Sequence, residues 1–268
     1  MKKTNILLKE HLYCTLFSRG IRGSFGIAVI LILWQILANY TPIVTGDPYP
    51  SSVFSKWIGG EFHTLAGQLF YILLPLLCAL PFQSRFFLDK RDGYLKSLLL
   101  RISRREIFVS YYLANFIVSF IITACAFLLN LLVSSMLYPA LRPQPLLNFL
   151  PSNQNALMVD LFFEYPWIYC LIYIIMISLF MAALSNVGLA FGQYMKNAFF
   201  VIVSPFMGYF IFVFALEQLG LSAYSPLYFL QPTQINYASW STYFAYLLGM
   251  LGVSFFVFRN QVDTCEIL

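Results

Sequence analysis

Charged residues are scarce in this sequence. They make up 10% of its 268 residues, whereas hydrophobic residues make up 60%. Soluble globular domains carry about 25% charged residues, which cover their water-facing surface. This composition excludes an ordinary soluble globule, and it predicts an integral membrane protein whose outer surface faces lipid.

Residues and motifs that carry chemistry are also few. The two histidines, His11 and His63, cannot form a histidine-rich metal cluster or supply a Ser–His pair at membrane depth. The five cysteines show no CxxC spacing. No G-x-x-x-x-G-K-[ST] phosphate loop occurs, so the chain cannot hold ATP in that way. We expect no catalytic residue, no bound metal and no cofactor in this chain.

Long apolar stretches are what the sequence has in abundance. A transmembrane helix needs about 20 apolar residues, whereas a barrel strand needs only about 9–11. The six windows of that length are 24–42, 65–83, 108–138, 167–192, 198–216 and 240–258. They contain no Asp, Glu, Lys, Arg or His, which argues against a proton-driven carrier. The sequence predicts an all-α integral membrane protein with six transmembrane helices in one domain, 24–258.

Basic residues alternate between the gaps of this pattern. Among the 16 Lys and Arg residues, only Lys56 and Arg142 lie in the gaps 43–64, 139–166 and 217–239. Because cytoplasmic loops carry the Lys and Arg excess, we expect both termini in the cytoplasm, including a tail at 259–268. We also expect the membrane to be the plasma membrane of a bacterium. The net charge of +5 then reports topology, and no nucleic-acid partner is expected.

The N-terminal segment, 1–23, differs from the spans. Leu8, Leu12 and Leu16 recur every four residues, which predicts an amphipathic helix lying in the cytoplasmic interface of the bilayer. The alternative is a simple extension of the first span. Gly20 and Gly23 favour a break between the two.

The gap 84–106 holds the densest pattern of charge and apolar residues. A loop that only reverses the chain uses two to six residues, yet this one exceeds twenty and includes Phe86–Leu88 and Leu98–Leu100. Such a composition is typical of short amphipathic helices that meet a protein or a membrane. A basic loop held by anionic lipid is the alternative.

This gap and the six-span layout resemble the membrane subunit of an ATP-binding-cassette exporter of the type-two permease family. The matching features are Asp89 or Asp92, then Gly93, the apolar stretch Leu95–Leu100 and the Ser103–Arg104 pair before the third span. The resemblance implies a coupling helix that docks on separate cytoplasmic ATPase subunits, which bind ATP and Mg²⁺. It also implies a second permease subunit, alike or different. The candidate coupling residues are Phe86, Phe87, Asp89, Asp92, Gly93, Tyr94, Leu95, Leu98, Leu99 and Arg104.

Neutral polar residues follow one face of the third span. Asn115, Ser119, Thr123, Asn130 and Ser134 are spaced to share one side of a helix. They form either interhelical hydrogen bonds or the lining of a translocation path or subunit interface. Gly188 and Gly192 in the fourth span form a small-xxx-small pattern that allows another helix to approach closely.

The gap 217–239 is too apolar for a solvated loop, and it predicts a re-entrant helical segment in which Leu219, Leu221, Tyr228, Phe229 and Leu230 are buried. The family that the chain resembles has re-entrant helices at this place. We therefore expect a permease subunit of an ATP-driven exporter. Uncharged spans and an aromatic outer surface favour an amphipathic or lipophilic cargo such as a peptide, an antibiotic or a lipid. The alternative is a non-transporting membrane anchor or sensor whose outer loops bind a partner.

Overall fold

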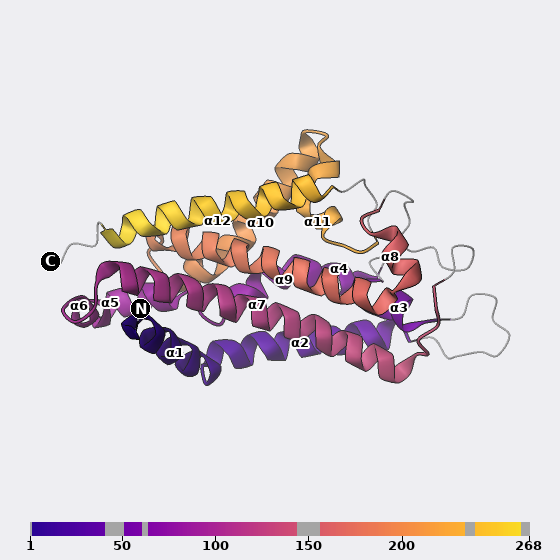
Figure 1. The fold of residues 1–268 in the computed structure, drawn as a ribbon, viewed down its shortest axis with the longest axis horizontal. Helices are drawn as coiled ribbons and strands as arrows, with labels where there is room; N and C mark the ends of the chain where they lie inside the picture. Colours follow the sequence, from indigo (N-terminus) through magenta and orange to yellow (C-terminus); the bar gives the residue numbers. More distant parts are fainter. Residues whose placement is uncertain (1, 41–50, 61–63, 144–155, 234–238, 264–268) are drawn as a thin grey trace.

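The computed structural model describes residues 2–40, 51–60, 64–143, 156–233 and 239–263 (Figure 1). Within these ranges the chain is helical and contains no strand. Five described helices are long and apolar enough to cross a membrane. They are α2 (Arg19–Ala38), α7 (Arg104–Leu137), α9 (Pro166–Phe191), α10 (Ala198–Gln218) and α12 (Trp240–Asp263). The prediction of an all-helical, multi-pass membrane protein is confirmed.

The remaining helices are shorter. They are α1 (Lys2–Leu16), α3 (Val53–Lys56), α4 (Leu65–Ala79), α5 (Arg85–Arg91), α6 (Tyr94–Leu99), α8 (Val159–Glu164), η1 (Gly192–Tyr194), η2 (Ser222–Tyr224) and α11 (Pro226–Phe229). Helices α1, α5 and α6 gather with the C-terminal part of α12 at one end of the bundle, which we call the basic end. Helices α3 and α8 lie at the opposite end (Figure 1).

Helix α4 is shorter than the predicted span 65–83. It ends at Ala79, after 15 residues, because Pro81 has no amide hydrogen to donate to the carbonyl of Leu77. The hydroxyl of Ser24 in α2 donates to that carbonyl instead, at 2.6 Å. Gly20 lets α2 approach this turn closely, since a Cβ there would lie 2.6 Å from the carbonyl oxygen of Leu80.

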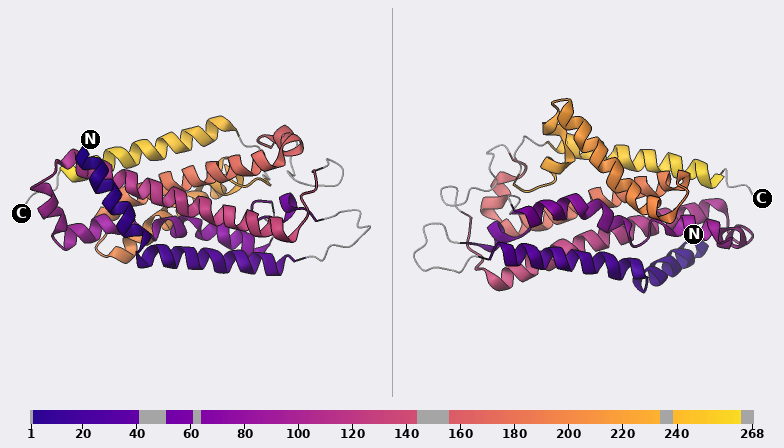
Figure 2. Two further views of the ribbon diagram at one scale, coloured as in Figure 1. Left: turned by 60° about the horizontal axis from the view of Figure 1, so that its bottom comes forward. Right: turned by 180° about the vertical axis from the view of Figure 1, so that it is seen from behind.

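The break between α1 and α2 falls at Phe17 and Ser18, not at the two glycines expected to cause it. Ser18 caps α2 by accepting a hydrogen bond from the amide of Ile21 at 3.2 Å. Figure 2 shows that α1 lies at an angle to α2 and does not continue its line.

The packed face of α1 also differs from the expected leucine stripe. Leu7, His11 and Thr15 are its most buried residues, at 1–2% exposure, whereas Leu16 is 62% exposed. Leu8 and Leu12 are half-buried beside the packed face. The stripe was misplaced because α1 packs on α7, which covers a polar histidine and threonine that an apolar pattern does not count.

Burial is uneven among the long helices. In α9, 72% of the most apolar 18-residue stretch is buried inside the protein, compared with 22% in α10 and 17% in α12. Helix α9 is therefore the central element, and α10 and α12 present most of their apolar side chains outward.

The segment after α10 is only partly buried. Phe229 and Leu230 pack into the core, whereas Leu219 is 71% and Leu221 43% exposed, contrary to expectation. The buried part is held by rings, since Phe229 lies 6.0 Å from Phe180 and 5.6 Å from Tyr246 between ring centroids. Burial therefore begins with α11, after the turn that follows α10.

Candidate functional site

The loop predicted to dock a partner forms a helical hairpin of α5 and α6. Gly93 separates the two helices with φ of +79°, a left-handed conformation that costs glycine little and other residues more. Lys90, Arg91, Asp92 and Lys96 are exposed on the outer side of the hairpin. The hairpin thus presents a charged surface at the basic end.

Three of the predicted coupling residues point inward. Phe86 is 1%, Leu95 4% and Leu98 8% exposed, so none of them is available to contact a docked partner. The Phe86 ring lies 5.0 Å from the rings of both Tyr111 and Phe258. The expectation that they form the docking surface is wrong, because an amphipathic pattern cannot distinguish the chain's own core from a partner.

The other predicted coupling residues lie nearer the surface. Tyr94 and Asp92 are exposed, whereas Phe87, Leu99 and Arg104 are half-buried. Leu100, which follows α6, is 81% exposed. An outer face made of charged residues with Tyr94 and Leu100 is what the hairpin offers to another molecule.

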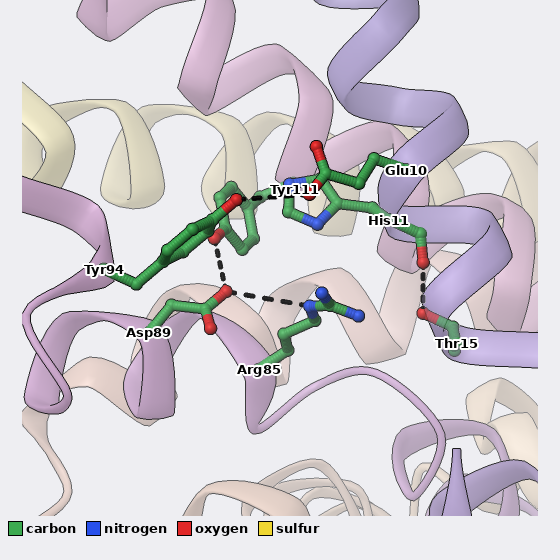
Figure 3. Close-up of polar contacts among 7 residues, drawn as sticks. All are labelled: Glu10, His11, Thr15, Arg85, Asp89, Tyr94 and Tyr111. Carbon is green, nitrogen blue, oxygen red and sulfur yellow. Dashed lines mark hydrogen bonds and ion pairs between the residues drawn. The ribbon is translucent and has the colours of Figure 1, made fainter. Parts of the chain in front are cut away.

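A polar junction joins the hairpin to α1 and α7 (Figure 3). The Tyr111 hydroxyl in α7 donates to Oδ2 of Asp89 in α5 at 2.5 Å, and Nε of Arg85 lies 3.7 Å from the same oxygen. The Tyr94 hydroxyl in α6 donates to Oε1 of Glu10 in α1 at 3.3 Å. The Tyr111 bond ties α5 to the start of α7, and the Tyr94 bond ties α6 to α1.

Asp89 is the central acid of this junction. Burial raises the pKa of its carboxyl group, while the hydrogen bond from Tyr111 and the charge of Arg85 oppose that rise. Of the two aspartates named as candidates for the acidic position, Asp89 lies inside the junction and Asp92 lies on the surface, beside Arg91 at 3.1 Å. Asp89 therefore has a structural role in holding the hairpin.

His11 is the residue of this site that sequence reasoning missed. It is 1% exposed, its ring lies 4.2 Å from the Tyr111 ring and 5.8 Å from the Phe82 ring, and neither of its nitrogens has a hydrogen-bond partner among the described residues. Burial, aided by the charge of Arg85, lowers its pKa to about 3. The imidazole is therefore neutral at physiological pH. No sequence signal marks it, since only the packing of α1 on α7 buries the ring.

The polar face of α7 lies in the middle of the bundle. Nδ2 of Asn115 donates to Ser185 at 3.0 Å and to Oδ1 of Asn186 at 2.8 Å, both in α9. The Ser119 hydroxyl lies 2.9 Å from the Ser185 hydroxyl and from the carbonyl of Cys78 in α4. These residues join three helices and leave no exposed polar surface on this part of α7.

Asn130 extends this pattern toward the opposite end. Its Nδ2 donates to Oε1 of Gln35 in α2 at 2.9 Å, and its Oδ1 accepts from the amide of Ile58 at 2.7 Å. Thr123 bonds the carbonyl of Ser119 in its own helix, at 2.9 Å, and the buried Ser134 hydroxyl has no partner within the described ranges. In this structure the polar face contributes interhelical bonds at Asn115, Ser119 and Asn130.

Both glycines of the small-residue pattern lie where helices meet. A Cβ at Gly188 would overlap Gln83 and lie 2.8 Å from Cδ of Pro205 in α10, and one at Gly192 would lie 2.5 Å from Cγ1 of Val201. They allow α9 to approach α10 and the turn between α4 and α5.

An apolar groove runs between α9, α10 and α12. Its volume is about 700 Å³. Its lining includes Phe180, Leu184, Gly188, Met207, Tyr246 and Met250. Such a groove can accept an apolar chain or ring from the lipid side.

The described residues contain no group of three or more His, Cys, Asp or Glu side chains placed to hold a metal ion. Comparison with protein-family models, curated proteins and solved structures finds no match. The function must therefore be argued from the geometry of the site and the pattern of the sequence.

Proposed function

We propose that this chain is the membrane subunit of an ATP-driven exporter, coupled to a separate ATPase through the α5–α6 hairpin. The observation that carries the proposal is the way this hairpin is attached to the transmembrane helices. Its inner face is packed through Phe86, Leu95 and Leu98, and its polar side is tied through Asp89 to Tyr111 of α7. A docking element that transmits displacement has to be attached rigidly to the helices it moves.

Six membrane crossings fit this proposal better than five. The described chain starts and finishes at the basic end (Figure 1), whereas five lengthwise passes would leave its two ends at opposite ends of the bundle. Helix α4 supplies the sixth pass, with its 15 residues extended by the buried turn at Pro81, Phe82 and Gln83. Irregular backbone at membrane depth is tolerated where protein covers it.

The positive charges orient this bundle. The basic end carries the hairpin and the starts of α1 and α2, so the rule that cytoplasmic loops are basic places both termini and the hairpin in the cytoplasm. Helix α1 then lies at the inner interface of the membrane, with Ile6, Tyr13, Leu16 and Phe17 exposed toward lipid. The segment with α11 is the re-entrant element on the outer side. The membrane is the plasma membrane of a bacterium.

We assign the cargo and the second subunit to the side of the molecule formed by α10 and α12, whose apolar side chains face outward. The apolar groove between α9, α10 and α12 suits an amphipathic or lipophilic cargo. The outward face of α10, which includes Phe199, Phe210 and Ile211, suits contact with a second permease subunit of the same or a different kind. ATP and Mg²⁺ bind to the ATPase subunits in this mechanism.

The test is a charge reversal on the exposed hairpin. Replacing Lys90, Arg91 and Lys96 by Glu should abolish co-purification of a protein that contains a phosphate loop and hydrolyses ATP, while membrane insertion stays normal. Replacing Arg19 and Arg22, also exposed at the basic end, by Glu is the control for charge reversal outside the hairpin. Changing the buried Leu98 would be uninformative, because it disrupts the hairpin itself.

Retention of the ATPase by the hairpin variant, or its loss in both variants, would refute the coupling role of this surface. If no ATPase accompanies even the unaltered chain, the alternative of a membrane anchor or sensor is favoured. Photocrosslinking from position 97 should reach the same ATPase, whereas crosslinking from the exposed Asp160 in α8 should not.

A further inference from the structure

A basic pocket lies beside the hairpin, between the start of α7 and the end of α12. Its volume is about 330 Å³. Its lining consists of Arg104, Arg105, Phe108, Val109, Phe255 and Arg259. Three arginines and three apolar residues thus share one cavity.

The two kinds of side chain are separated along the helices. In α7, Arg104 lies one turn before Phe108 and Arg105 lies one turn before Val109, and all four line the pocket. In α12, Arg259 follows Phe255 by one turn. Both helices therefore change from apolar to basic at the same end of the pocket.

This change coincides with the membrane surface. The apolar run of α7 begins at Ile107 and that of α12 ends at Phe258, so the arginines lie just outside the apolar part of two membrane-crossing helices. The apolar wall is ordered by ring contacts, since the Phe108 ring lies 5.2 Å from the rings of both Phe255 and Phe258. A ligand in this pocket has a charged part in water and an apolar part in lipid.

The geometry points to a binding site for one anionic phospholipid, whose phosphodiester lies among Arg104, Arg105 and Arg259 and whose acyl chains lie along Phe108, Val109 and Phe255. Guanidinium groups bind phosphate oxygens in pairs, which favours arginine over lysine at such a site. Basic pockets between transmembrane helices on the cytoplasmic side are suited to anionic headgroups. The site requires no ATPase and no cargo, so it holds independently of the proposed exporter function.

The test uses the purified full-length chain in detergent, titrated with phosphatidylglycerol and with phosphatidylcholine of the same acyl chains. Native mass spectrometry counts the bound lipid. Each arginine should contribute about fivefold to the preference for phosphatidylglycerol, so replacing Arg104, Arg105 and Arg259 by Gln should reduce it about a hundredfold. The control replaces Arg19, Arg22 and Arg101, which are exposed outside the pocket, by Gln and should change the preference less than about threefold.

Further arms separate the possible ligands. Inorganic phosphate should not displace phosphatidylglycerol, because it lacks the acyl chains that contact the apolar wall. A variant with Lys at all three pocket positions should keep the charge and the fold, yet lose part of the preference. The proposal is overturned if the two Gln variants lose preference equally, if neither loses any, or if inorganic phosphate displaces the lipid. It is also overturned if the pocket variant loses a co-purifying ATPase while its lipid preference stays unchanged, since the pocket would then bind protein.

Discussion

Two buried polar regions of this molecule differ in the hydrogen bonding of their central side chains. In the middle of the bundle, Asn115, Ser119 and Asn130 of α7 bond to side chains and backbone of three other helices. In the junction at the basic end, Asp89 is paired but His11 has no hydrogen-bond partner among the described residues. Hydrogen bonds between helices fix their positions, whereas a buried titratable side chain without a partner makes the stability of the junction depend on protonation.

The interior should be the costlier region to break. Replacing Asn130 by Leu leaves Oε1 of Gln35 and the amide of Ile58 without this partner inside the protein. We expect a loss of about 3 kcal/mol in the free energy of unfolding, measured as a lower Tm in detergent. Asn5→Leu, at an exposed position of α1, is the control and should have little effect. Equal Tm values for the two variants would contradict a structural role for the Asn130 network.

The junction should be distinguished by its response to acid. Because the folded pKa of His11 is lowered to about 3, its contribution to stability is complete above pH 6.5 and is lost as pH falls toward 3. Acidification from pH 7.5 to 5 should cost about 2 kcal/mol through this residue. His11→Phe, which keeps a ring against Tyr111 and Phe82, should remove that loss without lowering Tm at pH 7.5.

Asp89 provides a second test, because its contribution to stability changes with pH in the opposite direction to that of His11. Its folded pKa is raised, so the stability it contributes is present at low pH and is lost as pH rises through that value. The His11→Phe variant should therefore gain stability as pH falls through the raised pKa of Asp89, and Asp89→Asn in the same background should remove the gain. An unchanged acid response in His11→Phe would show that the junction titrates through other groups.

Gly188 lies between the two regions, where α9 meets Gln83 and Pro205. Gly188→Ala should destabilise the protein by about 1–2 kcal/mol, because both neighbours must shift to admit a methyl group. Gly249→Ala in α12 is a matched change with nothing within 4 Å of the new Cβ, and it should stabilise by up to about 1 kcal/mol. Tm shifts of the same sign would contradict close packing at Gly188.

The outer edge of the junction should contribute least. Tyr94→Phe removes the hydrogen bond to Glu10 but keeps the ring, and the pair is exposed to water. We expect a change of about 0.5 kcal/mol or less in the free energy of unfolding. Tyr13→Phe, on the exposed side of α1, serves as the control, and a larger loss for Tyr94→Phe than for Gly188→Ala would reverse this order.

The sequence predicted the positions of the long helices best, and it predicted least well which neighbours bury each helix face. Hydropathy placed α9 at Pro166–Phe191 within one residue of the expected window, because length and polarity decide whether a segment is a buried helix. It misassigned the outer face of the hairpin, where Leu95 and Leu98 are buried by the chain itself. Periodicity identifies a face that avoids water and says nothing about which neighbour covers it.

The polar face of α7 was recognised from its spacing, but its partners were not. Ser185, Asn186 and Gln35 come from segments far away in the sequence, and only the packing of α2 and α9 against α7 brings them into reach. His11 was overlooked for the same reason. A lone histidine in an amphipathic helix carries no signal until another helix covers it.

The early end of α4 has a consequence for how the protein is made. A short helix with Pro75 inside it and Pro81 after it has carbonyl groups that lipid cannot satisfy, and the hydroxyl of Ser24 satisfies that of Leu77. Because α2 is synthesised first, its serine is already present when α4 emerges from the ribosome. We therefore expect α2 and α4 to enter the bilayer as a pair, and a chain that lacks α2 to leave α4 outside it.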